Sequence, residues 1–228
     1  MAPTDKFIAL AEAWRELNRP FEVNDHLGPS RGSRWSVKDK KSPLLLTSVH
    51  GVRHFREGVG MKANDANTGG LVLVLAHHLK CSAAVITRSG ENDDANTDPV
   101  HPFKAAVANG IRLDRVRLLV DVHGMADHPS ADVAIGFGVA PDAATIGAAE
   151  RIERRLTAAG VRVDLGGVDT GLKAAHPGTM TNWAHARGLA GLQLEISRSR
   201  RTFQSSTAAR AQFLRALAEA FVDAQTGV

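Results

Sequence analysis

The chain has 228 residues, of which 43% are hydrophobic and 23% charged, and it carries a formal net charge of +4. This length fits a single domain, residues 1–228, with a substantial buried core, and no stretch approaches the roughly 18 apolar residues that span a bilayer. The basic residues are spread along the chain, and with no tyrosine and 5% aromatic residues there are few surfaces on which bases could stack. Composition thus argues against membrane proteins and nucleic-acid-binding proteins.

The N-terminal part predicts a helix over residues 4–18, whose apolar side chains recur at helical spacing. Charged residues interrupt this apolar pattern, which indicates a surface helix and not a signal peptide. A polar stretch containing Pro, Gly and Ser follows over residues 19–42 and predicts a loop, with room for short strands. The single cysteine, Cys81, excludes an intrachain disulfide, so we expect a cytoplasmic protein.

From residue 43 onward, short apolar runs that predict buried strands alternate with amphipathic runs that predict helices. The predicted strands cover residues 43–49, 83–87, 117–122, 132–138, 161–165 and 192–196. The predicted helices cover residues 68–80, 142–159, 181–188 and 206–223. This alternation predicts an α/β sandwich around a mostly parallel sheet, in which binding sites form beyond the carboxyl ends of the strands.

Two of the predicted strands end in a histidine that glycine follows: His50 after strand 43–49, and His123 after strand 117–122. A single histidine at a strand end is more often structural, but two of them favour a metal site. A catalytic zinc takes about three protein ligands, for which imidazole and carboxylate are suitable, and keeps one position open. Two histidines and a carboxylate from an adjoining loop would meet that need.

Two acidic residues lie within or beside predicted strands. Glu195 is flanked by leucine and isoleucine, and burial of a carboxylate without a partner is costly. Its alternation with apolar residues is also compatible with a solvated face of the sheet, so periodicity leaves its role open. Asp121 comes two positions before His123 and should point to the same face. It would either hydrogen-bond a ligating imidazole or cap a loop.

A polar run follows the predicted strand 83–87, from Arg88 to Asp98. It is either a solvated acidic loop or part of a binding site at the carboxyl end of that strand. In the second case Arg88 would hold a carboxylate of the substrate, and Asn96 would provide a polar contact.

The order of these motifs along the chain resembles that of the N-formylglutamate amidohydrolase family, a distant relative of the zinc carboxypeptidases and the aspartoacylase-type deacylases. The resemblance covers roughly residues 43–200. The segments that carry it are Val49-His50-Gly51, Thr87-Arg88, Asp94-Ala95-Asn96, Asp121-Val122-His123, Gly178-Thr179-Met180-Thr181 and Glu195. Two positions depart from the family pattern, because Gly51-Val52 replaces Ser-Gly after the first histidine and Thr97 replaces an arginine.

The resemblance implies a three-layer αβα sandwich around a mixed, mostly parallel sheet and a single zinc ion. It implies that His50, Glu57 and His123 hold the ion. The carboxypeptidase relatives use His-x-x-Glu, and His54-Phe55-Arg56-Glu57 has that spacing, so His54 is the alternative to His50. Glu195 and Arg88 would be the catalytic residues. The substrate would be bound by Arg88, Asn96, Thr179 and Thr181.

The expected activity is that of a zinc-dependent amidohydrolase acting on an N-acyl amino acid or a related small carboxylate. The expected partner is therefore a small anionic substrate, with no nucleic acid and no membrane, and a homo-oligomer is left open. Two alternatives remain at this point. One is a zinc peptidase that acts on peptides or cell-wall fragments, and the other is a non-catalytic relative that binds a ligand in the same cleft.

Overall fold

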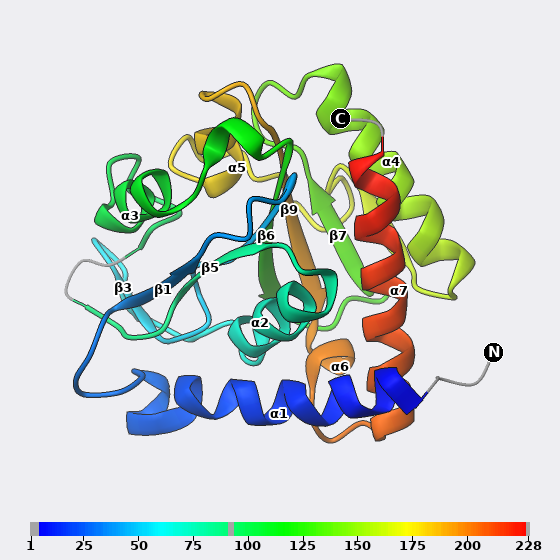
Figure 1. The fold of residues 1–228 in the computed structure, drawn as a ribbon, viewed down its shortest axis with the longest axis horizontal. Helices are drawn as coiled ribbons and strands as arrows, with labels where there is room; N and C mark the ends of the chain where they lie inside the picture. Colours follow the sequence, from blue (N-terminus) through cyan, green and yellow to red (C-terminus); the bar gives the residue numbers. More distant parts are fainter. Residues whose placement is uncertain (1–4, 91–93, 227–228) are drawn as a thin grey trace.

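A computed structural model describes residues 5–90 and 94–226, and Figure 1 shows its α/β architecture. The central sheet has seven strands in the order β1-β5-β2-β6-β9-β7-β8, with four parallel and two antiparallel pairings. The strands are β1 (Trp35–Lys38), β2 (Leu44–Ser48), β5 (Ser82–Ile86), β6 (Leu118–Met125), β7 (Val133–Gly136), β8 (Val163–Leu165) and β9 (Ala190–Ser197). This sheet confirms the predicted class of fold, a mixed and mostly parallel sheet with helices packed on it.

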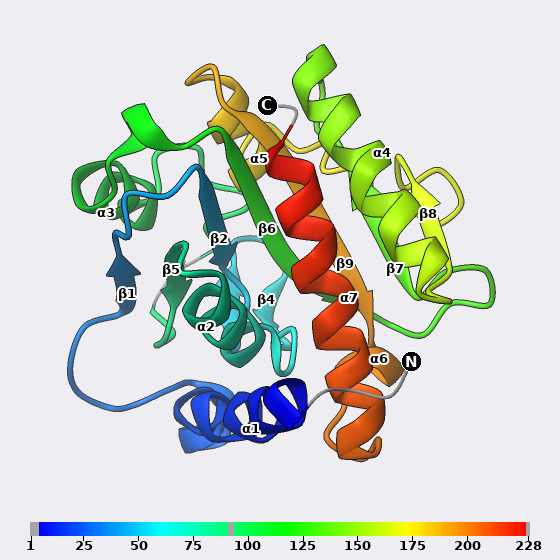
Figure 2. The same cartoon turned by 45° about the vertical axis from the view of Figure 1, so that its right-hand side comes forward.

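The helices lie on both faces of the sheet. Figure 2 shows α2, α4 and α7 in front of the sheet, and α5 packs against β9 from the other side. The helices are α1 (Asp5–His26), α2 (Thr68–Leu79), α3 (Pro102–Gly110), α4 (Ala143–Ala158), α5 (Met180–His185), α6 (Arg198–Arg201) and α7 (Thr207–Gln225). A 3₁₀ turn (Leu113–Arg115) and a separate hairpin of β3 (His54–Arg56) and β4 (Gly60–Lys62) complete the elements. Within the described ranges, no helix combines the length and the apolar character that a membrane crossing requires.

Helix α1 runs further than the apolar pattern predicts. The expected loop after residue 18 is wrong for its first turns, because the helix continues through Pro20 and only loses helical geometry near Val23. The physical reason is tertiary packing. The Phe21 side chain is fully buried, and its ring lies so close to Gly69 that a Cβ there would come within 2.3 Å of it. Burial of an aromatic ring outweighs the local cost of a proline inside a helix.

Strands β6 and β9 run parallel at the centre of the sheet and determine which side chains reach the site. Their register pairs Asp121 with Gln193 and His123 with Glu195. Successive side chains of a strand point to opposite faces, so these four polar residues share one face. The residues that alternate with them are apolar and buried, namely Val120, Val122, Leu192 and Leu194. In these two strands, one face therefore belongs to the hydrophobic core, and the other carries the chemistry.

Helix α5 covers only the amino-terminal part of that polar face. Gly191 lies on the same side of β9 as Glu195, and a Cβ at Gly191 would come within 2.7 Å of the Thr181 carbonyl oxygen. The close approach of α5 requires glycine at this position. Beyond it, toward the carboxyl ends of the strands, the face is open to the loops that form the site.

Candidate active site and metal centre

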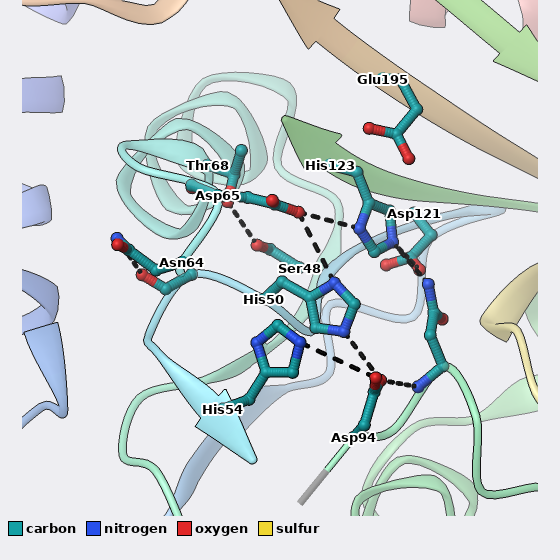
Figure 3. A network of polar contacts seen from close by, with 12 residues as sticks. Ser48, His50, His54, Asn64, Asp65, Thr68, Asp94, Asp121, His123 and Glu195 are labelled. Atoms are coloured by element: carbon teal, nitrogen blue, oxygen red, sulfur yellow. Dashed lines mark hydrogen bonds and ion pairs between the residues drawn. The ribbon is translucent and has the colours of Figure 1, made fainter. Parts of the chain in front are cut away.

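The sheet brings the two predicted histidines together, as Figure 3 shows. His50 follows β2, and His123 lies inside β6, which continues three residues beyond its predicted end at Val122. Because β2 and β6 are adjacent and parallel, both side chains emerge at the same edge. Their ring centroids are 4.9 Å apart, and both side chains are buried. Residues that are distant along the chain thus share one site.

The acidic group at this site is Asp65. Its Oδ2 lies 3.0 Å from Nδ1 of His123 and 3.6 Å from Nδ1 of His50. The residue belongs to the loop before α2, where its backbone N–H donates to the His50 carbonyl and its own carbonyl accepts from the Thr68 hydroxyl. Sequence reasoning missed Asp65, which lies in a short polar segment just ahead of the predicted helix 68–80. The signal available in the sequence was the position of this acidic residue between the two segments that carry His50 and His123.

The structure does not bring Glu57 to this cluster, which differs from the ligand set of His50, Glu57 and His123 that the resemblance implies. Glu57 is exposed in the turn between β3 and β4, and it lines a neighbouring pocket instead. The physical reason is the hairpin itself. The chain leaves His50, reverses at Glu57 and returns along β4, so the acidic residue that comes back to the histidines is Asp65.

Each imidazole has its other nitrogen on a buried carboxylate. Nε2 of His50 lies 2.9 Å from Oδ1 of Asp94, and Nε2 of His123 lies 2.7 Å from Oδ2 of Asp121. Carboxylates placed in this way fix the orientation of ligating imidazoles and increase their basicity. Here they direct both Nδ1 atoms toward Asp65. Of the two roles that the sequence left open for Asp121, the structure shows the hydrogen bond to His123.

This set of donor atoms fits a divalent metal ion. Two imidazole nitrogens and one carboxylate oxygen lie within 4.8 Å of one another. Ligand atoms about 2.0–2.1 Å from a tetrahedral zinc would lie about 3.3 Å from each other. The distances of 3.0 and 3.6 Å between Asp65 and the two imidazoles lie on either side of this value. Small shifts of the side chains would therefore accommodate an ion.

The electrostatics of the cluster point the same way. Burial by itself would lower the pKa of His50, but hydrogen bonds to Asp65 and Asp94 raise it, and Asp121 with Asp65 raises the pKa of His123 well above its usual range. Burial opposes ionisation of Asp65, yet its hydrogen bonds to His123 and His50 hold its pKa below the ordinary range. The carboxylates thus favour positive charge at this point, whether protons or a metal ion supply it.

His54, the alternative ligand, lies behind His50. The two rings are stacked, with centroids 3.9 Å apart and an interplanar angle of 4°. His54 is buried, and burial lowers its pKa to about 4, so the ring is neutral at neutral pH. Its Nε2 is 3.7 Å from Oδ2 of Asp94, but the Arg56 guanidinium already contacts that oxygen. His54 therefore supports the ring of His50, and Arg56 occupies the place that a second cation would need.

Glu195 lies beside His123 in the neighbouring strand. Its side chain is almost buried, at 8% exposure, and lines the pocket that also contains His50, Asp65 and His123. Oε1 accepts a hydrogen bond of 2.9 Å from the Gln193 amide. Burial raises the pKa of Glu195 to about 7. A carboxyl group with such a pKa can both accept and release a proton near neutral pH.

The pocket over this cluster has a volume of about 480 Å³. Its lining residues come from the hairpin, the loop before α2, the segment between β5 and α3, the end of β6 and the segment before α5, and include Arg56, Lys62, Asn96, Met125, Asp127 and Leu172. Asn96 is the predicted substrate-binding residue that the structure places here. Its side-chain nitrogen lies 3.0 Å from Nε2 of His123, and its amide oxygen accepts from the Met180 backbone N–H. Asn96 is thus itself held in position by the segment that contains Met180.

The other predicted substrate contacts are not brought to the pocket. Arg88 donates to the Ser30 carbonyl oxygen and is absent from the described lining of the pocket. Thr179 caps helix α5 by accepting from the Asn182 backbone N–H, and Thr181 is fully buried in that helix. The two threonines therefore shape the element that supports Asn96.

No family model and no curated protein matches the sequence. Solved structures, in contrast, match over most of the chain. A bacteriophage poly-gamma-glutamate hydrolase has a TM-score of 0.55 at 15% identity, over 87% of this chain and 91% of its own. The N-formylglutamate amidohydrolase from Ralstonia eutropha JMP134 has a TM-score of 0.55 at 16% identity, over 86% of this chain and 100% of its own.

A third match is a metallo-carboxypeptidase from Burkholderia cenocepacia. It has a TM-score of 0.50 at 12% identity, and the alignment covers 81% of this chain and 57% of the enzyme. At these identities the comparison establishes the fold. The chain has the fold of N-formylglutamate amidohydrolase and of its carboxypeptidase-like relatives, as the order of its motifs predicts.

Proposed function

We propose that the protein is a metal-dependent hydrolase that cleaves an amide bond in an N-acyl amino acid or a related small carboxylate. One observation carries the proposal: two imidazole Nδ1 atoms and an Asp65 oxygen converge beside the buried carboxyl group of Glu195 in one pocket. The names of the structural neighbours support it, since they are hydrolases of amide or peptide bonds.

His50, Asp65 and His123 would hold one divalent ion, and the choice of imidazole and carboxylate suits zinc. Such an ion would polarise the scissile carbonyl group and increase the acidity of water at its open position. Asp94 and Asp121 keep the two imidazoles in the required orientation through their Nε2 atoms. Asn96, beside His123, restricts movement of that ring.

Glu195 is proposed to be the general base and then the general acid. With a pKa near 7 it is partly ionised at neutral pH, so it can take a proton from the attacking water and deliver it to the leaving nitrogen. Gln193 donates a hydrogen bond to one carboxyl oxygen, which fixes the plane of the group, while no described residue hydrogen-bonds the other oxygen, so that oxygen can exchange a proton. Burial excludes bulk water that would otherwise compete for that proton.

The test combines metal analysis, a panel of N-acyl amino acids and the variant Glu195→Gln. We expect about one zinc per chain, hydrolysis of at least one amide of the panel, and a variant that keeps its zinc while turnover falls about 10²–10⁴-fold. Glu219→Gln, a change on the exposed side of α7, is the matched control and should behave as the unaltered protein. A protein that binds no metal and cleaves no amide would refute the proposal, and full activity of Glu195→Gln would remove Glu195 from the mechanism.

A further inference from the structure

The hairpin β3–β4 contributes two basic side chains to the pocket, Arg56 and Lys62. Its register places Lys62 opposite His54, and Arg56 follows His54 by two residues in the same strand. Because side chains alternate along a strand, all three lie on one side of the hairpin. His54 packs on His50 at the metal centre, so Arg56 and Lys62 face the same pocket.

Both cations are available to a ligand. Among the described residues the Lys62 side chain has no hydrogen bond or ion pair, although it lies in the wall of the pocket. Arg56 uses its Nε for Asp94 and keeps 33% of its side chain exposed, which leaves the outer edge of the guanidinium for a further partner. A carboxylate accepts hydrogen bonds from both kinds of side chain, and charge on both partners makes such bonds strong.

The remaining charges of the pocket indicate where an anion would bind. Asp65 and Glu195 belong to the metal centre and the proton transfer, and the exposed Asp127 also lines the pocket. These carboxylates repel an anion, so the favourable position is on the side of the hairpin. Arg88, the arginine that the sequence motifs indicate, lies outside this pocket.

We propose that Arg56 and Lys62 form a binding site for a free carboxylate of the substrate, separate from the group that is cleaved. The substrates would be amides of acidic compounds, with the carboxylate on the hairpin side and the scissile bond at the metal centre. The position of the scissile bond rests on the proposed function, whereas the binding of the carboxylate does not. Asp94 connects the two sites, since it contacts Arg56 through one oxygen and His50 through the other.

The binding test uses glutarate and its neutral diamide as probes, titrated calorimetrically into the zinc-loaded protein. We expect glutarate to bind at least tenfold more tightly than the diamide, and Lys62→Gln to weaken glutarate binding about tenfold, as for the loss of one charged hydrogen bond. Arg53→Gln is the matched control, because Arg53 has the same 33% side-chain exposure as Arg56 but pairs with Asp25 away from the pocket. It should leave glutarate binding unchanged.

A second variant, Arg56→Gln, is measured together with its zinc content, because Arg56 also contacts the carboxylate that orients His50. Weaker glutarate binding at full zinc content supports the site. Glutarate binding that is insensitive to Lys62→Gln, or equally weakened by Arg53→Gln, overturns it. The same holds if the diamide binds as well as glutarate.

An activity arm separates this inference from the proposed function. The pair N-acetyl-L-glutamate and its neutral diamide, both assayed by release of acetate, differs in the presence of free carboxylates, and Lys62→Gln should lower kcat/KM about tenfold for the first amide only. If the protein cleaves no amide but binds glutarate in a manner that depends on Lys62, the hydrolase proposal fails and the anion site stands. If both amides are cleaved equally well, the anion site fails and the hydrolase stands.

Discussion

The identity of the acidic metal ligand gives the sharpest test of the site, because spacing in the sequence favours Glu57 and the structure favours Asp65. The perturbation is Asp65→Asn, which keeps the size of the side chain and removes its charge. Carboxylates that act only by orienting a ligating histidine contribute about 10–100-fold to metal affinity. The Asp65 oxygen lies within 3.6 Å of both Nδ1 atoms, so its loss should cost at least the upper end of that range. We therefore expect a decrease in zinc affinity of 100-fold or more, about 2.7 kcal/mol.

The assay is competition for zinc with a chelator of known affinity, and Glu57→Gln is the control. Glu57 is exposed in the turn of the hairpin, so its variant should bind zinc as the unaltered protein does. Circular dichroism of both variants would show that the fold is retained. A loss of zinc affinity in Glu57→Gln with normal affinity in Asp65→Asn would refute the assignment. Zinc affinity in both variants equal to that of the unaltered protein would mean that neither carboxylate holds the ion.

Three further outcomes are expected. Asp121→Asn should lower zinc affinity about 10–100-fold in the same chelator assay, since its carboxylate orients His123; unchanged affinity would contradict that role. Lys104→Met should lower the free energy of unfolding at pH 7 by about 2–4 kcal/mol in urea titrations, because three carbonyl oxygens lose their donor. Burial lowers the pKa of Lys104 from 10.5 to about 8, so between pH 8 and 10.5 the unfolded chain binds more protons than the folded protein. The stability of the unaltered protein relative to Lys104→Met should therefore rise with pH in that window. A difference in stability that does not change with pH would contradict the shift. Gly69→Ala should reduce Tm by several degrees, because the Cβ of the new alanine would meet the ring of Phe21 and cost about 1–3 kcal/mol of stability. An unchanged Tm would show that the ring can move aside.

The strands of the central sheet other than β1 could be predicted because burial leaves short apolar runs in the sequence, whereas β1, which is only half-buried, falls in the stretch predicted as a loop. His50 and His123 could be singled out for a related reason, since each stands where such a run gives way to glycine. Parallel pairing of β2 with β6 then brings the two side chains to one edge. Composition and order along the chain were sufficient for this part of the site.

What could not be predicted depends on short segments whose path is set by tertiary contacts. The hairpin β3–β4 has three residues in each strand, too few for a recognisable period, yet it decides that Asp65 and not Glu57 returns to the histidines. The same hairpin presents Arg56 and Lys62 to the pocket. Helix α1 likewise passes Pro20 because of the distant contact between Phe21 and Gly69.

Strand β9 has a consequence for how this protein can change over time. Its residues alternate between the hydrophobic core and the polar face, with Leu194 and Ile196 on one side and Glu195 on the other. Because this alternation has a period of two, insertion or deletion of one residue within the strand would turn the carboxyl group into the core and a leucine or isoleucine into the pocket. Stability and chemistry would be lost in one event. Length variation should therefore be confined to the surface loops, while β9 keeps its number of residues in any descendant that retains the activity.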